Sequence, residues 1–198
     1  ALSIQLYKEN NSLPQIQSVS AIPESVLEAI EKGVASFKGS RRRCEVIGEK
    51  EGVLVLDDYG HHPTAVKTTL EGIRDFYSDR VIIVDFMSHT YTRTAALLEE
   101  FAESVSYADY TILNKIYPSA RENIDSCVVN NVPVTGKLLY EKAQKYSSNV
   151  YYAEEILDAL PIVKELVKKP LPKGKNGYLL VTMGAGDNWK LGKVFLKN

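Results

Sequence analysis

The sequence predicts an α/β domain built on a mostly parallel sheet with helices on both faces. From about residue 43 onward, short runs rich in apolar and β-branched residues alternate with amphipathic helical stretches. One run, "RVIIVDF" at residues 80–86, is almost continuously apolar, as is typical of a strand buried on both faces of a parallel sheet. With right-handed crossovers through the helices, the arrangement would be Rossmann-like.

The first 42 residues look purely helical and form a separate part of the chain. "ALSIQLYKEN" opens without a start methionine or a capping residue. "IPESVLEAIEKGVASF" places an apolar stripe along one helical face, made of Val26, Leu27, Ile30, Val34 and Phe37. Two helices without a sheet cannot cover both of their apolar stripes. We therefore expect residues 1–42 to be the helical tail of a preceding domain and residues 43–198 to be the next domain.

The alternating region contains the pattern of each expected element in chain order. Residues 44–59 read as a β-hairpin with Gly52 in the turn, and residues 65–77 read as an amphipathic helix. The later strands are expected at 80–86, 110–116, 149–153 and 177–184, and the later helices at 94–105, 136–146 and 154–169. Residues 168–177, rich in Lys, Pro and Gly, are expected to form a surface loop.

Composition and charge exclude several classes of partner. The chain has 198 residues, 44% hydrophobic and 25% charged, as expected for one globular domain with or without an appendage. A net charge of −1 and a pI near 6.4 give no overall field that would attract nucleic acid or an anionic membrane. Cys44 and Cys127 lie far apart, and no apolar run approaches the roughly 20 residues that a membrane span needs. A cytoplasmic location is expected.

Polar clusters follow three of the predicted strands. They are "DDYGHHPT" at 57–64, "MSHTYTRT" at 87–94 and "MGAGDNW" at 183–189, and the first two hold all three histidines of the chain. Ligands of open α/β sheets bind beyond the carboxyl ends of the strands, where loops meet helix N-termini. Pro63 keeps His62 out of the helical region and sets the start of a helix. These clusters therefore predict an anion-facing corner.

Each cluster also permits a simpler interpretation. The carboxylates and histidines do not have the spacing of a helical HExxH or a common zinc site, which argues against a metal. The first cluster could be a polar turn in which Asp57 or Asp58 caps backbone amides. Residues 88–94 could be a capped helix start with a surface arginine. What favours a functional site is that the histidines gather at neighbouring strand ends.

Two glycine-containing patterns and one arginine run are weak signals. "MGAGD" lacks a dinucleotide fingerprint, because Trp189 stands where a third glycine is needed. "GDNWKLGK" has no Ser or Thr after Lys193, so a phosphate loop is absent from it. "GSRRRCE" has no interleaved aromatic residues, and we expect a solvated bend with one arginine aimed into a site.

Taken together, the motifs resemble one family, the Mur ligases of bacterial cell-wall synthesis. The resemblance rests on "FKGSRRRCE", "DDYGHHPT", "SHTYTRT" with the following "LLEEFAESV", and "TMGAGDNW", in this order over residues 37–189. It implies that residues 1–42 are the end of a central ATP-binding domain and that residues 43–198 are the C-terminal domain. Within the family, the motifs are most similar to those of the branch that joins L-alanine to UDP-N-acetylmuramate.

The resemblance implies a cytoplasmic, Mg-dependent, ATP-consuming ligase. ATP would phosphorylate the lactyl carboxylate of UDP-N-acetylmuramate, the amine of L-alanine would attack the acyl phosphate, and phosphate would leave. The Mg ligands, phosphate loop and UDP-binding domain would precede this chain. The chain would act as a lid that contacts the missing central domain, and we expect it to be inactive by itself.

The resemblance also assigns roles to residues on the nucleotide side. Arg43 would contact the ATP phosphates, for which a guanidinium is well suited. Asp58 would accept hydrogen bonds from the nucleotide ribose. Tyr59 and His61 would lie beside the nucleotide and the incoming amino acid, with His61 in the reaction zone.

A second group of residues would serve the amino acid. His89 and Arg93 would face the alanine, with Arg93 pairing with its carboxylate, and both belong to the expected catalytic set with His61. Asp187 and the Gly184–Gly186 backbone, with Gly186 against the substrate, would close the pocket. The chain departs from the family at Thr90, where many members have an arginine. A second cationic contact with the substrate is therefore not expected from this position. Met87 and Ser88 also replace a more usual Gln-Pro pair.

Two other interpretations stay open. The chain could be the C-terminal domain of another Mur-type ligase, such as the recycling enzyme that attaches a whole tripeptide. It could also be a non-catalytic nucleotide- or ligand-binding module that kept the fold, because function belongs to sites and not to folds. The presence of Arg43, Asp58, His61, His89 and Arg93 together favours a ligase.

Overall fold

The computed structural model describes residues 22–37, 39–120, 122 and 127–197, and it divides the chain into two units, 1–40 and 41–198. In the first unit the described helix is α2 (Glu24–Ser36), which starts directly after Pro23. Val26 is buried, whereas Val34 and Phe37 keep 70% and 69% of their surface exposed. The expected apolar face of this helix is therefore covered mainly at its start. The helix expected at 1–10 lies outside the described residues.

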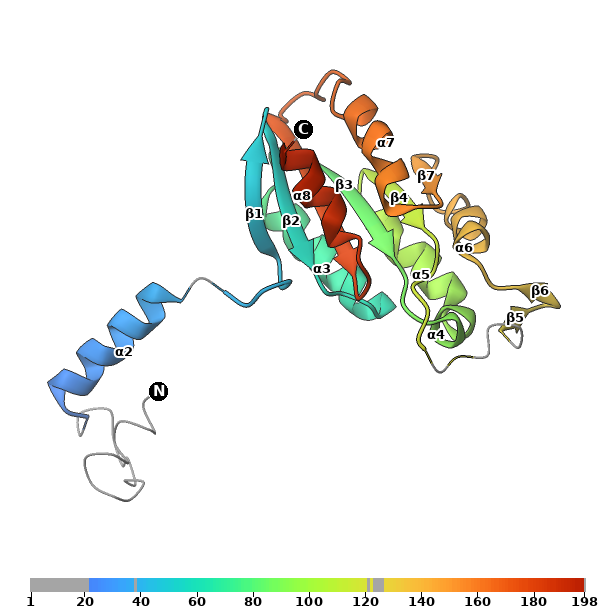
Figure 1. The fold of residues 1–198 in the computed structure, drawn as a ribbon. Coiled ribbons are helices and arrows are strands. Elements are labelled where there is room, and N and C mark those ends of the chain that lie inside the picture. Colours follow the sequence, from blue (N-terminus) through green and yellow to red (C-terminus); the bar gives the residue numbers. More distant parts are fainter. Residues whose placement is uncertain (1–21, 38, 121, 123–126, 198) are drawn as a thin grey trace. The chain divides into compact units, whose positions relative to one another are not determined.

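The second unit is built on a six-stranded sheet with the strand order β1-β2-β8-β3-β4-β7 (Figure 1). Only β1 runs antiparallel to its neighbour, and every other pair in this sheet is parallel. This confirms the predicted α/β class and the opening hairpin, whose turn places Gly52 at a φ of 77°. The strands are β1 (Glu45–Lys50), β2 (Val53–Asp58), β3 (Arg80–Met87), β4 (Tyr110–Asn114), β7 (Val150–Ala153) and β8 (Gly177–Gly184).

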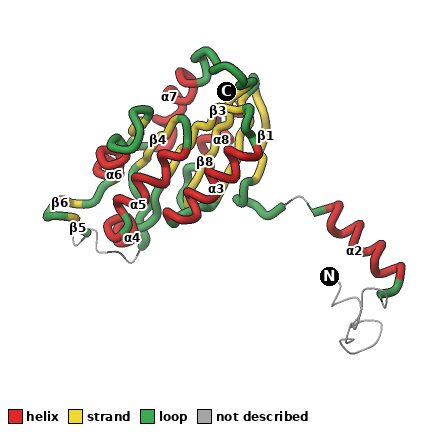
Figure 2. The backbone as a smooth tube through the Cα atoms, turned by 180° about the vertical axis from the view of Figure 1, so that it is seen from behind, coloured by secondary structure: helices red, strands yellow, loops and turns green. Residues whose placement is uncertain are grey.

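Helices cover both faces of the sheet, as predicted. One face carries α3, α5 and α6, which lie nearest the viewer in Figure 2, and the other carries α7 and α8, which lie in front of the sheet in Figure 1. The helices are α3 (Pro63–Phe76), α4 (Tyr91–Ala96), α5 (Leu98–Ser104), α6 (Gly136–Ala143), α7 (Ala159–Leu166) and α8 (Trp189–Lys197), with short 3₁₀ turns η2 (Val105–Tyr107) and η4 (Ile156–Asp158). A separate small hairpin pairs β5 (Val128–Val129) with β6 (Val132–Pro133).

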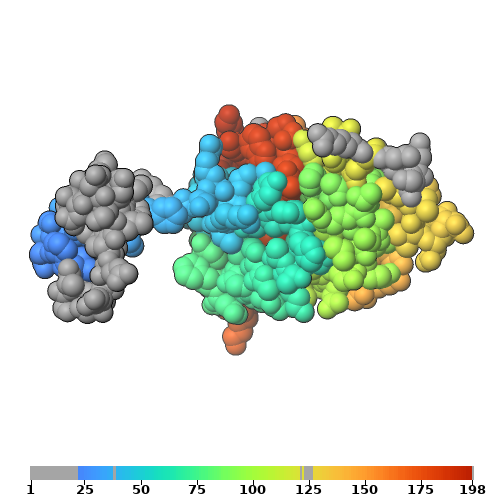
Figure 3. All heavy atoms as spheres, turned by 90° about the horizontal axis from the view of Figure 1, so that it is seen from below, coloured from blue at the N-terminus to red at the C-terminus, as the bar shows by residue number. Residues whose placement is uncertain are grey.

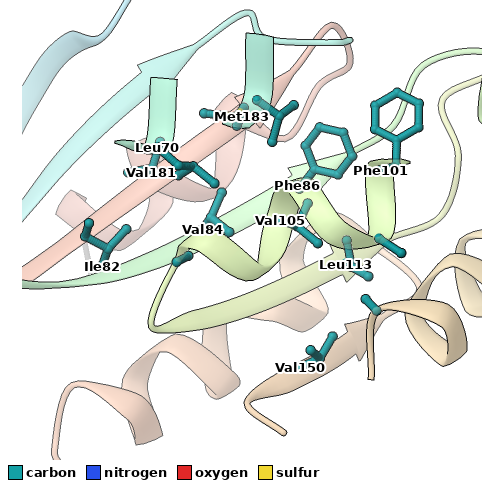
Figure 4. Close-up of a cluster of buried hydrophobic side chains, with 14 of the residues drawn as sticks. Leu70, Ile82, Val84, Phe86, Phe101, Val105, Leu113, Val150, Val181 and Met183 are labelled. Carbon is teal, nitrogen blue, oxygen red and sulfur yellow. The ribbon is translucent and has the colours of Figure 1, made fainter. Parts of the chain in front are cut away.

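Two hydrophobic cores lie on the two faces of the sheet because successive residues of a strand point to opposite sides. In β3, Ile82, Val84 and Phe86 belong to the core under α3, α5 and α6, which Figure 4 shows. Val81 and Ile83 belong to the core under α7 and α8. This strand is therefore buried on both faces, as its continuous apolar run predicts.

The structure differs from the sequence-based expectation at three helices. The helix expected at 94–105 is interrupted at Leu97, which has a φ of −125° and separates α4 from α5. The helix expected at 154–169 begins as an α-helix only at Ala159, because Pro161 has no N–H and fits the first turn. Helix α8 was not predicted, although its buried Leu191 and Phe195 have helical spacing.

Candidate active site

The three polar clusters meet at the carboxyl edge of the parallel strands. In the sheet β8 lies between β2 and β3, with Asp58 paired to Met183 and Met87 paired to Gly184. The loops that follow these strands are therefore neighbours in space. Seen from below, the segments that start α3, α4 and α8, coloured teal, green and red, meet on this face (Figure 3). The strand order thus produces the corner that the sequence predicts.

Three of the expected site residues form an aromatic row. The ring centroids of Tyr59 and His61 are 5.1 Å apart, and those of His61 and His89 are 6.5 Å apart. His61 Nδ1 lies 2.9 Å from the carbonyl oxygen of Tyr59, which fixes the orientation of the imidazole. Tyr117 extends the row, with its ring centroid 5.8 Å from that of His89. Sequence reasoning missed Tyr117, which lies in the loop after β4.

The surroundings of His89 favour the neutral form of its imidazole. Burial, the nearby guanidinium of Arg93 and the ring of His61 together lower the pKa of His89 below its ordinary value. Arg93 Nη1 is buried and has no hydrogen-bond acceptor among the residues that the structure describes. A buried, unpaired guanidinium N–H costs free energy and is a donor that a carboxylate ligand could satisfy.

Hydrogen bonds fix the segment that carries His89 and Arg93. Thr90 caps α4, since its Oγ1 accepts from the backbone N–H of Arg93 at 3.3 Å. It does so at a φ of 70°, a conformation that a β-branched residue rarely adopts. The Thr90 N–H donates to the carbonyl oxygen of Tyr117 at 2.9 Å, and the Tyr117 N–H donates to that of Ser88 at 2.9 Å. Tyr117 therefore ties the loop after β4 to the histidine loop.

Glu122 provides a further anchor for the first turn of α4. Its carboxylate accepts from the N–H of Thr92 at 2.9 Å, from the hydroxyl of Thr92 at 2.7 Å and from the N–H of Ser119 at 3.0 Å. Burial acts to raise the pKa of Glu122, but these hydrogen bonds outweigh it and lower the pKa to about 2. The carboxylate is therefore charged at any physiological pH.

On the side predicted to bind the nucleotide, Asp58 is buried and bonded to the backbone. One oxygen accepts from the Cys44 N–H at 2.9 Å, and the other accepts from the Gly60 N–H at 2.7 Å. Asp58 therefore does cap backbone amides, as the simpler interpretation of this cluster expects. The remaining lone pairs leave room for the ribose role, which stays a prediction.

Within the arginine run at residues 41–43, the arginine that points into the protein is not the one to which a role was assigned. Arg43 is exposed, and its guanidinium stands over the Tyr59 ring, 5.7 Å from the centroid. Arg42 is the arginine that points inward, where it binds Asp57 and the carbonyl oxygen of Gly184. Sequence reasoning did not single out Arg42, because spacing alone cannot distinguish three consecutive arginines. The ATP contact of Arg43 stays a prediction.

Gly184 at the end of β8 and Gly186 in the following loop lie too close to their neighbours to carry side chains. A Cβ at Gly184 would collide with the carbonyl oxygen of Met87, and one at Gly186 would collide with the Met87 sulfur and approach the Tyr117 ring. Gly184 also has a φ of 140°. Asp187, expected to close the pocket, pairs with Lys190 at 2.6 Å. Gly186 therefore lies against the Met87 and Tyr117 wall.

Neither a metal site nor a membrane span is found in the described part of the chain. The described residues include no group of three or more His, Cys, Asp or Glu side chains that could hold a metal ion. None of the described helices combines the length and the apolarity needed to cross a membrane.

Comparison with known proteins identifies the family. The family model for "Mur ligase, glutamate ligase domain" matches residues 42–186, so this chain belongs to the Mur ligase family. A curated relative from Treponema pallidum (strain Nichols), a UDP-N-acetylmuramate–L-alanine ligase, is 51% identical over 168 residues, which are 85% of this chain and 32% of the relative. The chain spans about a third of the length of the curated relatives it matches. The resemblance seen in the motifs is thereby confirmed.

Solved structures share the fold. That of the UDP-N-acetylmuramate–alanine ligase from Thermotoga maritima superposes with a TM-score of 0.59 at 21% identity, over 98% of this chain and 35% of that one. The murein peptide ligase from Psychrobacter arcticus gives a TM-score of 0.57 at 25% identity, over 97% of this chain and 36% of that one.

Proposed function

We propose that this chain is the C-terminal part of an ATP-dependent ligase that joins L-alanine to UDP-N-acetylmuramate. The observation that carries the proposal is that the ring centroids of His61 and His89 lie 6.5 Å apart at the carboxyl edge of the sheet, beside Arg93, whose buried Nη1 has no partner among the described residues. The relative at 51% identity, a UDP-N-acetylmuramate–L-alanine ligase, supports alanine as the amino acid. Residues 1–42 would be the end of the central ATP-binding domain and residues 43–198 the C-terminal domain.

In this proposal Arg93 and the two histidines serve the amino acid. Arg93 pairs with the carboxylate of alanine and thereby satisfies its unpaired N–H. The amine of alanine must lose a proton before it can attack an acyl phosphate, and a neutral imidazole can accept that proton. The lowered pKa of His89 favours this neutral form. In the neutral tautomer of His61 that donates from Nδ1 to the Tyr59 carbonyl, Nε2 is also an acceptor.

The nucleotide side is proposed to consist of Arg43, Asp58 and Tyr59. Arg43 has an exposed guanidinium that can reach phosphate oxygens, and Asp58 accepts from the ribose. We place the Mg ligands in the preceding central domain, as the family resemblance implies. We further propose a cytoplasmic location, and closure of this domain on the central one to exclude water from the acyl phosphate.

ATP-dependent phosphate release tests the proposal directly. The polypeptide that joins residues 1–198 to the preceding regions found in its relatives is supplied with UDP-N-acetylmuramate, ATP, Mg and L-alanine. We expect release with L-alanine, and no release by residues 1–198 alone. Substituting Arg93→Ala should raise the KM for alanine far more than the KM for ATP. Phosphate release with a tripeptide but not with alanine would instead identify the recycling ligase. No phosphate release with any amine would favour the non-catalytic binding module.

A further inference from the structure

We propose that Arg42 is a positioning residue that fixes the nucleotide side and the amino-acid side of the site to each other. The inference rests on the proposed function for its kinetic consequences, although the contacts themselves do not depend on it. It assigns to Arg42 a task inside the protein, distinct from the predicted phosphate contact of its exposed neighbour Arg43.

The guanidinium of Arg42 joins two strands of the sheet. Its Nε donates to Asp57 Oδ2 at 2.8 Å, at the end of β2, and its Nη2 donates to the carbonyl oxygen of Gly184 at 2.6 Å, at the end of β8. A planar guanidinium can hold two acceptors in a fixed relative orientation, which a lysine ammonium cannot do. Arg42 therefore sets the direction of the peptide group from which the Gly184–Asp187 loop departs.

The ion pair is protected from solvent. The side chain of Arg42 is 25% exposed and that of Asp57 is 5% exposed, so water screens their interaction less than it screens a surface pair. The other oxygen of Asp57 accepts from the hydroxyl of Thr182 on β8 at 2.9 Å. Both carboxylate oxygens of Asp57 are thus hydrogen-bonded, so the acceptor that Arg42 binds has a fixed orientation.

The backbone of Arg42 holds Tyr59 at the same time. The carbonyl oxygen of Arg42 accepts from the Tyr59 N–H at 2.8 Å, and its guanidinium stands 5.2 Å from the centroid of the Tyr59 ring. Arg42 adopts a φ of 55°, which is uncommon for a residue with a side chain. The Arg42 N–H donates to Glu45 Oε2 at 2.8 Å, which helps to keep this conformation. Strained backbone persists where surrounding contacts over-determine it.

These contacts place one residue between two halves of the candidate site. Tyr59 belongs to the proposed nucleotide side, and Gly184 leads to Gly186 on the proposed amino-acid side. Gly184 lies directly against Met87, since a Cβ at Gly184 would stand 2.3 Å from the Met87 carbonyl oxygen. Shifting the guanidinium would therefore displace both loops together, and misplacement of reacting groups by about 1 Å can cost up to roughly a hundredfold in rate.

Kinetics of the longer polypeptide test the inference with Arg42→Lys and a matched control. Arg74 supplies the control, because it also bridges a carboxylate and a backbone carbonyl, Asp109 at 3.2 Å and Tyr107 at 2.7 Å, outside the site. We expect Arg42→Lys to raise the KM values for both ATP and L-alanine and to lower kcat/KM by roughly tenfold to a hundredfold. Arg74→Lys should lower Tm and leave both KM values unchanged. A lowered Tm with unchanged KM values for Arg42→Lys would make its role merely structural and overturn the inference.

A double-mutant cycle and a ligand-free measurement complete the test. The effects of Arg42→Lys and Asp57→Asn on kcat/KM should be strongly non-additive, because both break one interaction. In residues 1–198 without ligand, Arg42→Lys should shift the amide resonances of Tyr59 and of Gly184–Asp187 together, and Arg74→Lys should shift neither. If the Tyr59 resonance shifts and those of Gly184–Asp187 do not, Arg42 does not couple the two loops and the inference is wrong. If the coupled shifts appear but no amine supports turnover, the positioning role stands and the proposed function fails.

Discussion

The rings of His61 and His89 face each other nearly at right angles, with an interplanar angle of 83° and 6.5 Å between their centroids. The two residues follow different strands, β2 and β3, which are not neighbours because β8 lies between them. Their proximity is therefore a product of the sheet order and of the two loops that bend over the end of β8.

Replacing His61 should raise the pKa of His89. Burial, Arg93 and His61, in this order, lower the pKa of His89, so His61→Gln removes one of the three causes. The expected upward shift is measurable by an NMR titration of the His89 ring protons. His62→Gln is the matched control, because His62 caps α3 through Thr64 and is not among those causes. An unchanged His89 titration in His61→Gln would mean that the two rings do not interact.

Truncating Tyr117 should broaden the range of amino acids that the proposed ligase accepts. Its ring packs on His89 and stands close to Gly186, so it bounds the side of the site assigned to alanine. Tyr117→Ala should raise the ratio of kcat/KM for L-valine to that for L-alanine, by roughly ten- to a hundredfold, since a methylene group changes binding by such factors. Tyr146→Ala, on an exposed tyrosine after α6, should leave the ratio unchanged. A uniform loss for both amino acids would argue against a role in selectivity.

Strands and buried helices could be predicted because their patterns are local. Residues 80–86 form an apolar run that coincides with β3, and residues 65–77 carry the stripe that α3 buries. The interruption at Leu97 could not be predicted, because the surrounding sequence is helical in pattern although Leu97 itself has a φ of −125°. Helix α8 gives a weaker sequence signal, because it has only nine residues and its buried apolar side chains are Leu191 and Phe195.

The site could be predicted as a set of residues but not as a set of contacts. The three clusters meet because they follow parallel strands, and sequence reasoning can foresee this. Which arginine points inward depends on positive φ angles at Arg42 and Cys44, which no residue preference predicts. Tyr117 reaches the site through a single bridge with His89, a contact between distant loops that leaves no local signal.

Neutralising Glu122 should loosen the start of α4. Because hydrogen bonds lower the pKa of Glu122 to about 2, its stabilising effect is present above the ordinary value of 4.5 and is lost as the pH falls toward 2. Glu122→Gln should lower the free energy of unfolding by about 1 kcal/mol at pH 7, a value kept small by solvent exposure. The difference from the unmodified chain should shrink at pH 3 and below, which urea unfolding at both pH values can measure. A difference that is constant with pH would show that the charge is not what matters.

Replacing Asp85 should make the fold more stable at alkaline pH. Asp85 is fully buried in β3, and one of its carboxylate oxygens, Oδ2, has no hydrogen-bond partner among the described residues. Burial raises the pKa of Asp85 to about 7, against hydrogen bonds from Asn114 and Asn188 that act to lower it. Because the folded pKa lies above the unfolded value of 3.8, this group favours folding most below about pH 4, and the benefit is lost as the pH rises to about 7.

Asp85→Asn removes the charge at nearly constant shape, so the variant should gain stability relative to the unmodified chain between pH 4 and pH 7. The gain should level off above pH 7 at no more than about 4 kcal/mol, the value that corresponds to the raised pKa. Urea unfolding of both chains at pH 5 and pH 8 measures it. Asp75→Asn, on an exposed carboxylate of α3, is the control and should show no such pH-dependent gain. If Asp85→Asn and the unmodified chain depend on pH in the same way, Asp85 does not titrate in this range, and its unpaired oxygen must be satisfied by another group.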